Sequence, residues 1–164
     1  MIHKKISVKI GEHHPTAEIT TYMIGNSEEL YDGRLRPLII ICPGGGYEMT
    51  SDREAEGIAL KFMAMGYHAA VLRYSVKPAV YPTALLQLAA TVKYFRENSD
   101  KYYIDADKII ICGFSAGGHL VASYGNSWNK AQFTNNRVNG NEVCRPNAQI
   151  LCYPVISSGK YGHK

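Results

Sequence analysis

The sequence lacks several features that define particular classes of protein. No apolar run approaches the length needed to cross a membrane, and residues 1–7 contain none long enough for a secretory signal. The net charge of +4 is spread along the chain, with no basic arm or basic helix of the kind that binds nucleic acid. We therefore expect a cytoplasmic protein that engages neither a membrane nor a nucleic acid.

Cysteine is scarce and is not spaced as in a metal or redox site. None of the four cysteines belongs to a C-x-x-C pair, and three lie in apolar runs typical of buried strands. They are Cys42, Cys112, Cys144 and Cys152. Because a reducing cytoplasm disfavours disulfides, we interpret all four as buried thiols. The histidines form no metal-ligand grouping, so the sequence predicts no metal and no cofactor.

The composition and the hydrophobic pattern indicate a single α/β domain over residues 1–164. The chain is 46% hydrophobic and 20% charged, as in an ordinary globular protein. Two stretches that alternate apolar and polar residues, 6–10 and 17–23, predict an antiparallel hairpin. Strands and helices then alternate, which predicts a mostly parallel sheet joined by right-handed crossovers.

Short apolar patterns define the expected elements. Continuous apolar runs predict strands buried on both faces, and helical spacing predicts the helices between them. The expected strands are 38–42, 67–72, 108–112 and 148–153, and the expected helices are 53–65, one that starts at Pro82 and one that starts at Ala116. A loop is expected around Asp100 and Asp105, and residues 125–146 predict a longer, mobile loop.

A nucleophile motif lies between an expected strand and an expected helix. The segment Gly113-Phe114-Ser115-Ala116-Gly117 fits G-x-S-x-G, and its glycines allow the tight turn that exposes a serine hydroxyl. We predict Ser115 as the nucleophile, with the amide of Ala116 at the helix N-terminus available to an oxyanion. A chance match and a phosphate-binding turn are the alternatives, but the sequence has neither a P-loop lysine nor G-x-G-x-x-G.

A second glycine-rich turn, Pro43-Gly44-Gly45-Gly46-Tyr47, follows the expected strand 38–42. Glycines at such a turn let bare amides face a substrate carbonyl. A flexible turn is the alternative for this segment, but its place one strand-helix-strand-helix unit before Ser115 favours an oxyanion role. Two readings stay open for Tyr47 and Met49, which either line an acyl or sugar pocket or serve in packing.

Other polar residues near these motifs are predicted to be structural. His119 follows Ser115 by four residues on the same expected helix, so its side chain is predicted to point toward the sheet or its flank. A structural role is therefore favoured over a role as general base. Arg73 and Tyr74 end a strand and are predicted to brace the floor of the site.

Together these motifs resemble those of the α/β-hydrolase esterase/lipase group, which includes acetyl-xylan esterase-like and bifunctional feruloyl and acetyl esterase-like enzymes. The matching segments cover nearly the whole chain and are 42–47, 72–74, 113–120 and 152–157. The resemblance implies an α/β-hydrolase fold with Ser115 as nucleophile and with Gly45, Gly46 and Ala116 as oxyanion donors. Pro43 is a departure, because many relatives have histidine there.

The resemblance also implies a carboxylic ester hydrolase that works through an acyl-serine intermediate. Acetylated sugars or xylan fragments are the favoured substrates, so the expected partner is a small-molecule ester such as an acetylated oligosaccharide. A homo-oligomer is left open. The alternatives are an amide or peptide hydrolase on the same fold, arylformamidase-like or prolyl-peptidase-like, and a non-catalytic binding domain in which Ser115 is idle.

The order of catalytic residues in this fold sets one more expectation. The acid and the base follow the nucleophile on loops after later strands, but the segment after Ser115 predicts only one strand. Glu142 and His163 precede the positions where the family's acid and base arise. We therefore expect the N-terminal portion of an α/β-hydrolase domain, lacking the last strands and helices. Such a fragment is predicted to be inactive alone and to have an unpaired strand edge.

Overall fold

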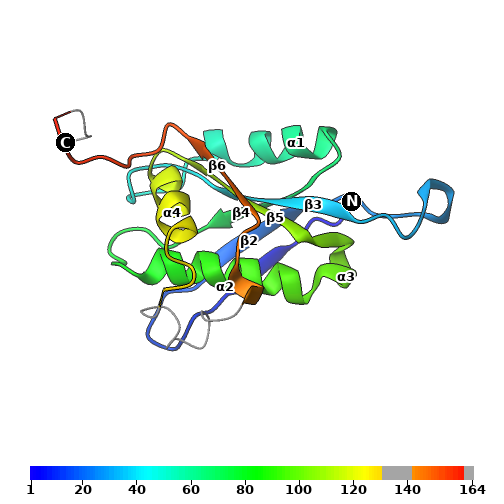
Figure 1. The fold of residues 1–164 in the computed structure, drawn as a ribbon, viewed down its shortest axis with the longest axis horizontal. Helices are drawn as coiled ribbons and strands as arrows, with labels where there is room; N and C mark the ends of the chain where they lie inside the picture. The colour runs from blue at the N-terminus through cyan, green and yellow to red at the C-terminus, as the bar shows by residue number, and fades with distance from the viewer. Residues whose placement is uncertain (131–141, 161–164) are drawn as a thin grey trace.

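A six-stranded sheet forms the centre of the structure, a computed structural model that describes residues 1–130 and 142–160 (Figure 1). The strands are β1 (Lys5–Val8), β2 (Ala17–Tyr22), β3 (Arg36–Cys42), β4 (His68–Arg73), β5 (Ile104–Phe114) and β6 (Ala148–Cys152). Their order across the sheet is β1-β2-β4-β3-β5-β6. β1 and β2 are antiparallel to their neighbours, whereas β4, β3, β5 and β6 run parallel. The predicted mixed sheet with an antiparallel N-terminal hairpin is confirmed.

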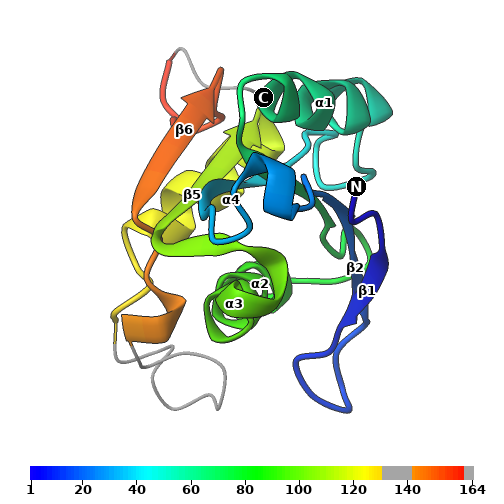
Figure 2. The same ribbon diagram turned by 90° about the vertical axis from the view of Figure 1, so that its right-hand side faces the viewer.

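Helices cover both faces of this sheet. They are α1 (Glu56–Ala64), α2 (Thr83–Glu97), α3 (Ser99–Tyr102) and α4 (Ala116–Gly125), with short 3-10 helices η1 (Glu28–Leu30), η2 (Asp52–Glu54) and η3 (Glu142–Cys144). Figure 2 shows α1 on one side of the sheet and α2 and α3 on the other. This layering follows from the apolar runs of the parallel strands, which must be covered on both faces.

Two apolar clusters join the layers. On one face, Leu88 and Phe95 of α2 pack with Ile40 of β3 and Leu120 of α4, all at most 1% exposed. On the other face, Ala59 of α1 packs in the cluster around the buried β3 side chains. Side chains of neighbouring residues in one strand therefore pack on opposite faces of the sheet. The two clusters hold β3, β4 and β5 in place, so that their carboxyl ends lie side by side.

The prediction of a loop around Asp100 and Asp105 is wrong. Asp100 lies in α3, and Asp105 lies in β5, which begins at Ile104. Ile104 pairs with Arg36 of β3 and a register shift follows, so the strand continues through the charged residues. Lys108 lies 2.8 Å from the Asp105 carboxylate, and Asp107 and Lys108 are exposed to solvent, so the strand accommodates this polar segment after the buried Ile104.

Part of the long segment predicted as a loop is ordered. α4 ends at Gly125, and η3 covers Glu142–Cys144. Residues 131–141, the centre of the loop predicted to be mobile, lie outside the described residues, as does His163. None of the four cysteines, all within the described residues, forms a disulfide, and Cys152 is the one that is not fully buried. Burial raises the pKa of Cys42 and of Cys112, the latter to about 12, so both stay thiols.

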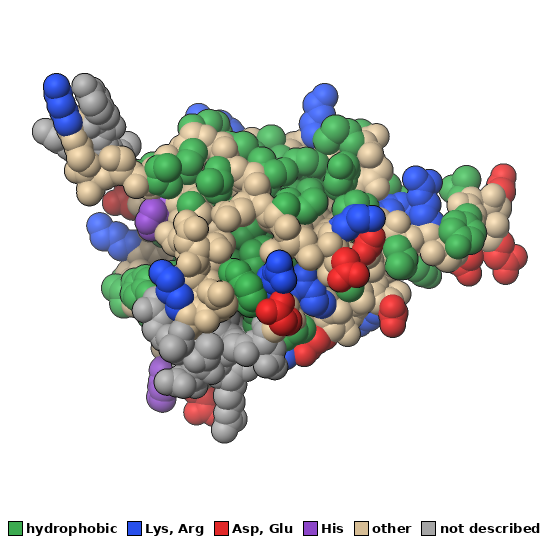
Figure 3. Space-filling model, viewed as in Figure 1, with side chains coloured by type: hydrophobic (Ala, Val, Ile, Leu, Met, Phe, Trp, Pro, Cys, Tyr) green, Lys and Arg blue, Asp and Glu red, His purple; other side chains and the backbone are tan. Residues whose placement is uncertain are grey.

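β6 forms an edge of the sheet, and the described residues pair it with β5 alone. Its apolar side chains remain partly open, with Ile150 36% and Leu151 42% exposed. Figure 3 shows apolar side chains gathered where Figure 1 places β6 and α1. The predicted unpaired edge is therefore found at the last strand.

Within the two described stretches of the chain, no helix is both long enough and apolar enough to cross a membrane.

Candidate active site

Ser115 occupies a strained turn between β5 and α4. Its φ of 50° and ψ of −115° lie in a region that residues with a side chain rarely adopt. A Cβ atom at Gly113 would overlap the carbonyl oxygen of Gly117, and a Cβ atom at Gly117 would overlap that of Cys42. The two glycines of G-x-S-x-G are thus required by close backbone approach, as the sequence predicts.

Hydrogen bonds from the neighbouring strand fix this turn. The amide of Ser115 donates to the carbonyl oxygen of Cys152 at 3.0 Å, and its own carbonyl accepts from the amides of His119 and Val155 at 3.0 and 3.3 Å. The turn is therefore clamped between the first turn of α4 and the segment that follows β6. The half-buried side chain of Ser115 faces a cavity.

This cavity has a volume of about 750 Å³. Ser115 and Ala116 lie on its wall together with Gly45, Gly46 and Tyr47, so every residue predicted for the site lines one space. The rest of the wall is Met49, Ser51, Arg53, Glu54, His119, Val155, Ile156, Ser157 and Ser158. Loops after β3, β5 and β6 meet here, because the carboxyl ends of parallel strands share one edge of the sheet.

The triple-glycine loop lies directly beside Ser115. A Cβ atom built on Gly44 would lie 3.0 Å from the Cβ atom of Ser115. Gly45 and Gly46 have φ values of 136° and 64°, and Tyr47 has a φ of 59°, so the loop follows a path that favours glycine. None of the hydrogen bonds of the described residues uses the amides of Gly45 and Gly46. Ala116 begins α4, where the first amides have no acceptor within the helix.

Contacts from the end of β4 and from residues later in the same loop hold this glycine loop in place. The hydroxyl of Tyr74 donates to the carbonyl oxygen of Pro43 at 2.6 Å, and the amide of Ser51 donates to that of Gly44 at 2.8 Å. Arg73 donates to the carbonyl oxygen of Thr50 at 2.8 Å. The structure places Arg73 and Tyr74 as braces of the loop, in agreement with their predicted structural role.

Glu54 is a site residue that the sequence reasoning missed. Its carboxylate accepts from the amide of Gly44 and from the hydroxyl of Tyr153, both at 2.7 Å. It thereby ties the glycine loop after β3 to the end of β6. The hydrogen bond to Glu54 raises the pKa of Tyr153 to about 12, so this hydroxyl remains a donor.

The available sequence signal for Glu54 points to a different contact. Ser51-x-x-Glu54 ahead of a helix is typical of a capping box, in which the glutamate accepts from the serine amide. In the structure the amide of Ser51 is bound by Gly44 instead, and the glutamate takes the amide of Gly44. The pattern identifies a residue with a backbone partner, but only the fold identifies that partner.

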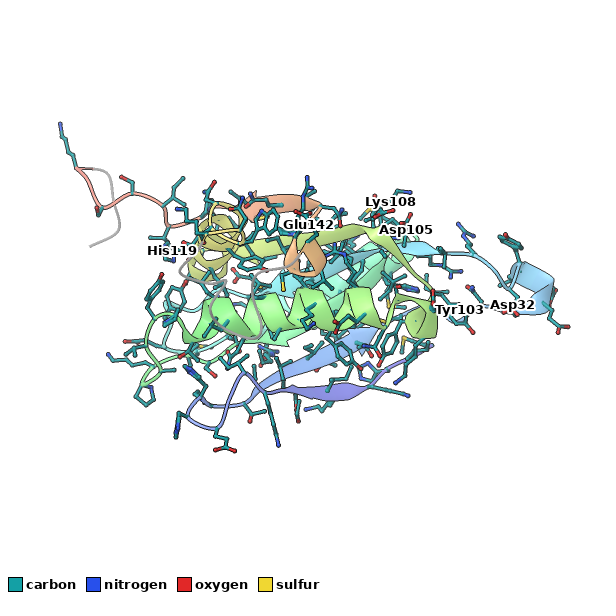
Figure 4. All side chains as sticks on the ribbon, turned by 60° about the horizontal axis from the view of Figure 1, so that its bottom comes forward. Asp32, Tyr103, Asp105, Lys108, His119 and Glu142 are labelled. Atoms are coloured by element: carbon teal, nitrogen blue, oxygen red, sulfur yellow. The ribbon has the colours of Figure 1, made fainter. Side chains whose placement is uncertain are left out.

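The predicted direction of the His119 side chain, toward the sheet or its flank, is wrong, whereas the described residues show no contact that would make it the base of Ser115. Its side chain is exposed, and its Nδ1 atom lies 2.8 Å from the hydroxyl of Tyr47. Leu120 and Val121 occupy the buried face of α4, which leaves position 119 on the cavity side. Figure 4 shows His119 at the opposite end of the sheet from Asp105 and Lys108.

No general base is in contact with Ser115 among residues 1–130 and 142–160. The hydrogen bonds there include none between the Ser115 hydroxyl and a histidine. Glu142, the acidic residue that follows Ser115 in the sequence, lies 3.3 Å from Arg145. These residues also contain no group of three or more His, Cys, Asp or Glu side chains that could hold a metal ion. The chemistry that this part of the site supports is nucleophilic attack by a serine next to unpaired amides.

Comparison with known proteins agrees with this architecture. The family model described as BD-FAE matches residues 29–155. Endo-1,4-beta-xylanase B of Butyrivibrio fibrisolvens is 35% identical over 132 residues, which is 78% of this chain and 21% of that protein. The chain therefore spans only a small part of this relative.

Two solved structures share the fold. The carboxylesterase Cest-2923 from Lactobacillus plantarum is 34% identical with a TM-score of 0.84, and the match covers 96% of this chain and 57% of that one. The acetyl ester-xyloside bifunctional hydrolase from Caldicellulosiruptor lactoaceticus is 31% identical with a TM-score of 0.78, covering 96% and 60%. The six-stranded sheet, the strained serine turn and the family match agree: the chain belongs to the BD-FAE family and has the α/β-hydrolase fold.

Proposed function

We propose that the protein is a serine carboxylic ester hydrolase with Ser115 as its nucleophile. The observation that carries the proposal is the strained turn that presents Ser115 to the cavity beside the glycine loop. The names of the similar proteins, a carboxylesterase and an acetyl ester hydrolase among them, support the reaction class.

In this proposal the Ser115 hydroxyl attacks the ester carbonyl and its proton passes to a general base. Negative charge then develops on the former carbonyl oxygen, and the amides of Gly45, Gly46 and Ala116 bind it. The N-terminus of α4 adds a favourable dipole at the same place. The alcohol leaves with a proton, and water hydrolyses the acyl-serine to release the acid.

The proposed substrate is a sugar that carries a small acyl group, such as an acetylated xylan fragment. Two of the similar proteins are named for xylan or xyloside hydrolysis. The cavity wall also offers polar groups near Ser115, since Ser51, Arg53 and Glu54 lie on it. Such groups suit the hydroxyls of a sugar, which need hydrogen-bond partners when they leave water. Tyr47 is proposed as part of the substrate-binding wall.

We propose further that the 164-residue chain is inactive on its own. Among the described residues the histidine at the cavity is His119, and its Nδ1 atom is engaged by Tyr47. A serine without its base loses roughly four to six orders of magnitude in rate.

The direct test is hydrolysis of p-nitrophenyl acetate by the protein as its gene encodes it, compared with Ser115→Ala. We expect the substitution to abolish turnover, whereas Ser157→Ala, which removes another hydroxyl from the same cavity, should retain it. The turnover of formyl-kynurenine and of aminoacyl substrates is measured for comparison. Faster turnover of these amides than of the ester, or an active Ser115→Ala variant, would contradict the proposal.

A further inference from the structure

A second cavity lies behind the wall of the first. It has a volume of about 420 Å³ and is bounded by the loop after β4 and by the facing sides of α2 and α4. Its lining is mainly apolar and includes Ala79, Val80, Pro82, Ala84, Leu85 and Leu120. The first cavity is more polar, because charged and hydroxyl side chains lie next to Ser115, although Met49, Val155 and Ile156 also line it.

Tyr47 and His119 are the two residues that line both cavities. The Tyr47 hydroxyl lies 2.8 Å from Nδ1 of His119, and the two rings meet edge to face with centroids 5.8 Å apart. Burial raises the pKa of Tyr47, so its hydroxyl stays protonated beside that nitrogen. The pair therefore forms a wall between the cavities, which we call the Tyr47–His119 partition.

Specific contacts hold the partition on the Tyr47 side. The carbonyl oxygen of Tyr47 accepts from the amide of Lys77 at 2.8 Å, and its ring packs edge to face against that of Tyr74 at 5.9 Å. On the other side, Nε2 of His119 lies 3.4 Å from the hydroxyl of Ser123. The Tyr47 side chain is thus fixed by contacts of its backbone, its ring and its hydroxyl. Removing this side chain should therefore join the two cavities.

We propose that the Tyr47–His119 partition determines the acyl size that the enzyme accepts. While the partition is closed, the acyl group must fit beside Ser115, which favours short acyl groups. Opening it lets a longer alkyl acyl chain extend into the apolar cavity behind. This inference rests on the proposed esterase function.

The polarity of the two cavities decides which half of the ester enters the second one. In the second cavity the hydroxyl groups of a sugar would lose their bound water and find few hydrogen-bond partners. Each unpaired hydroxyl group would weaken binding. An alkyl chain has the opposite preference and gains about 0.8 kcal/mol per buried methylene, which corresponds to roughly fourfold in binding. The sugar alcohol therefore stays in the first, more polar cavity, and the second cavity receives the acyl chain.

The experiment measures kcat/KM of the protein as its gene encodes it, for the p-nitrophenyl acetate, butyrate, hexanoate and octanoate series. Tyr47→Ala and His119→Ala should each raise the hexanoate-to-acetate ratio at least about tenfold, less than four fully buried methylenes would give. Tyr47→Phe keeps the ring and loses only the hydrogen bond, so a rise of about threefold is expected. If the alanine variants fail to fold, the ratio measured for Tyr47→Phe tests the proposal.

Two controls make the result specific to the partition. Leu60→Ala removes an exposed apolar side chain of α1 that lines neither cavity, and should leave the ratio within about twofold. Ala84→Phe fills the second cavity from α2. Combined with Tyr47→Ala, it should return the ratio to that of the unmodified protein.

Three results would overturn the inference. One is an unchanged ratio in folded variants at positions 47 and 119, with melting temperatures near that of the unmodified protein. Another is a gain that survives Ala84→Phe, because the chain would then lie elsewhere. The third is an unmodified protein that hydrolyses none of the esters, and this result alone also refutes the proposed function.

Discussion

We expect Glu54 to hold the glycine loop in position. The loss of stability on its replacement follows from its two hydrogen bonds. In Glu54→Ala the buried amide of Gly44 loses its acceptor, and an unsatisfied buried amide costs about 1–3 kcal/mol. Tyr153 is 65% exposed, so water replaces the bond that its hydroxyl loses. We therefore expect the free energy of unfolding to fall by about 1–3 kcal/mol, almost all of it from Gly44.

The same substitution should reduce turnover more than substrate binding. Gly44 lies between the carboxylate of Glu54 and the turn at Ser115, and it directly precedes the proposed donors. A displacement of about 1 Å in such a loop costs roughly 100-fold in rate, so we expect kcat to fall about 10- to 100-fold while KM changes little. Urea denaturation and p-nitrophenyl acetate kinetics measure the two effects.

Two further variants separate the contacts of Glu54. Glu54→Gln keeps an oxygen that accepts from the Gly44 amide, so its loss of stability should stay below about 1 kcal/mol. Tyr153→Phe removes only the exposed contact and should be within about 0.5 kcal/mol of the unmodified protein. The reasoning is refuted if Glu54→Gln loses as much as Glu54→Ala, or if Glu54→Ala retains full stability and full kcat.

Three other predictions concern the turn, helix α1 and the core. Gly117→Ala should destabilise the protein by about 3 kcal/mol or more and abolish activity, because the new methyl group would overlap the carbonyl of Cys42. Gly57→Ala in α1 meets open space and should stabilise the protein by about 0.5–1 kcal/mol. Urea denaturation measures the change in both glycine variants. Burial lowers the pKa of His68 to about 4, against 6.5 when exposed, so the unfolded chain binds the extra proton between these values. The associated stability of about 3 kcal/mol is present above pH 6.5 and lost as the pH falls to 4, and urea denaturation of His68→Gln should lack this slope.

The features predicted correctly from the sequence are those fixed by local rules. The turn at Ser115 needs glycine on both sides because backbone atoms lie at the Cβ positions, and this requirement is legible as G-x-S-x-G. The order of strands and helices can also be predicted from the sequence, because buried parallel strands require continuous apolar runs such as 38–42. The same local patterns predicted a common site for Gly45, Gly46 and Ala116, and all three line one cavity with Ser115.

The features that were missed depend on contacts between distant segments. β5 extends through Asp105 because Ile104 pairs with Arg36, a partner that no local pattern specifies. His119 faces the cavity because Leu120 and its neighbour fill the buried face of α4, a rotation that the spacing from Ser115 alone does not set. Glu54 binds the amide of Gly44 across a loop. In each case the tertiary fold selects between arrangements that the sequence permits equally.

The central claim is that the hydroxyl of Ser115 is an activated nucleophile beside an oxyanion site. A fluorophosphonate probe reacts with such a serine and leaves a covalent adduct, which peptide mass spectrometry locates on the protein as its gene encodes it. We predict one labelled site, at Ser115, and complete loss of labelling in Ser115→Ala. An adduct at another serine, or no adduct on a folded and unmodified protein, would contradict the account.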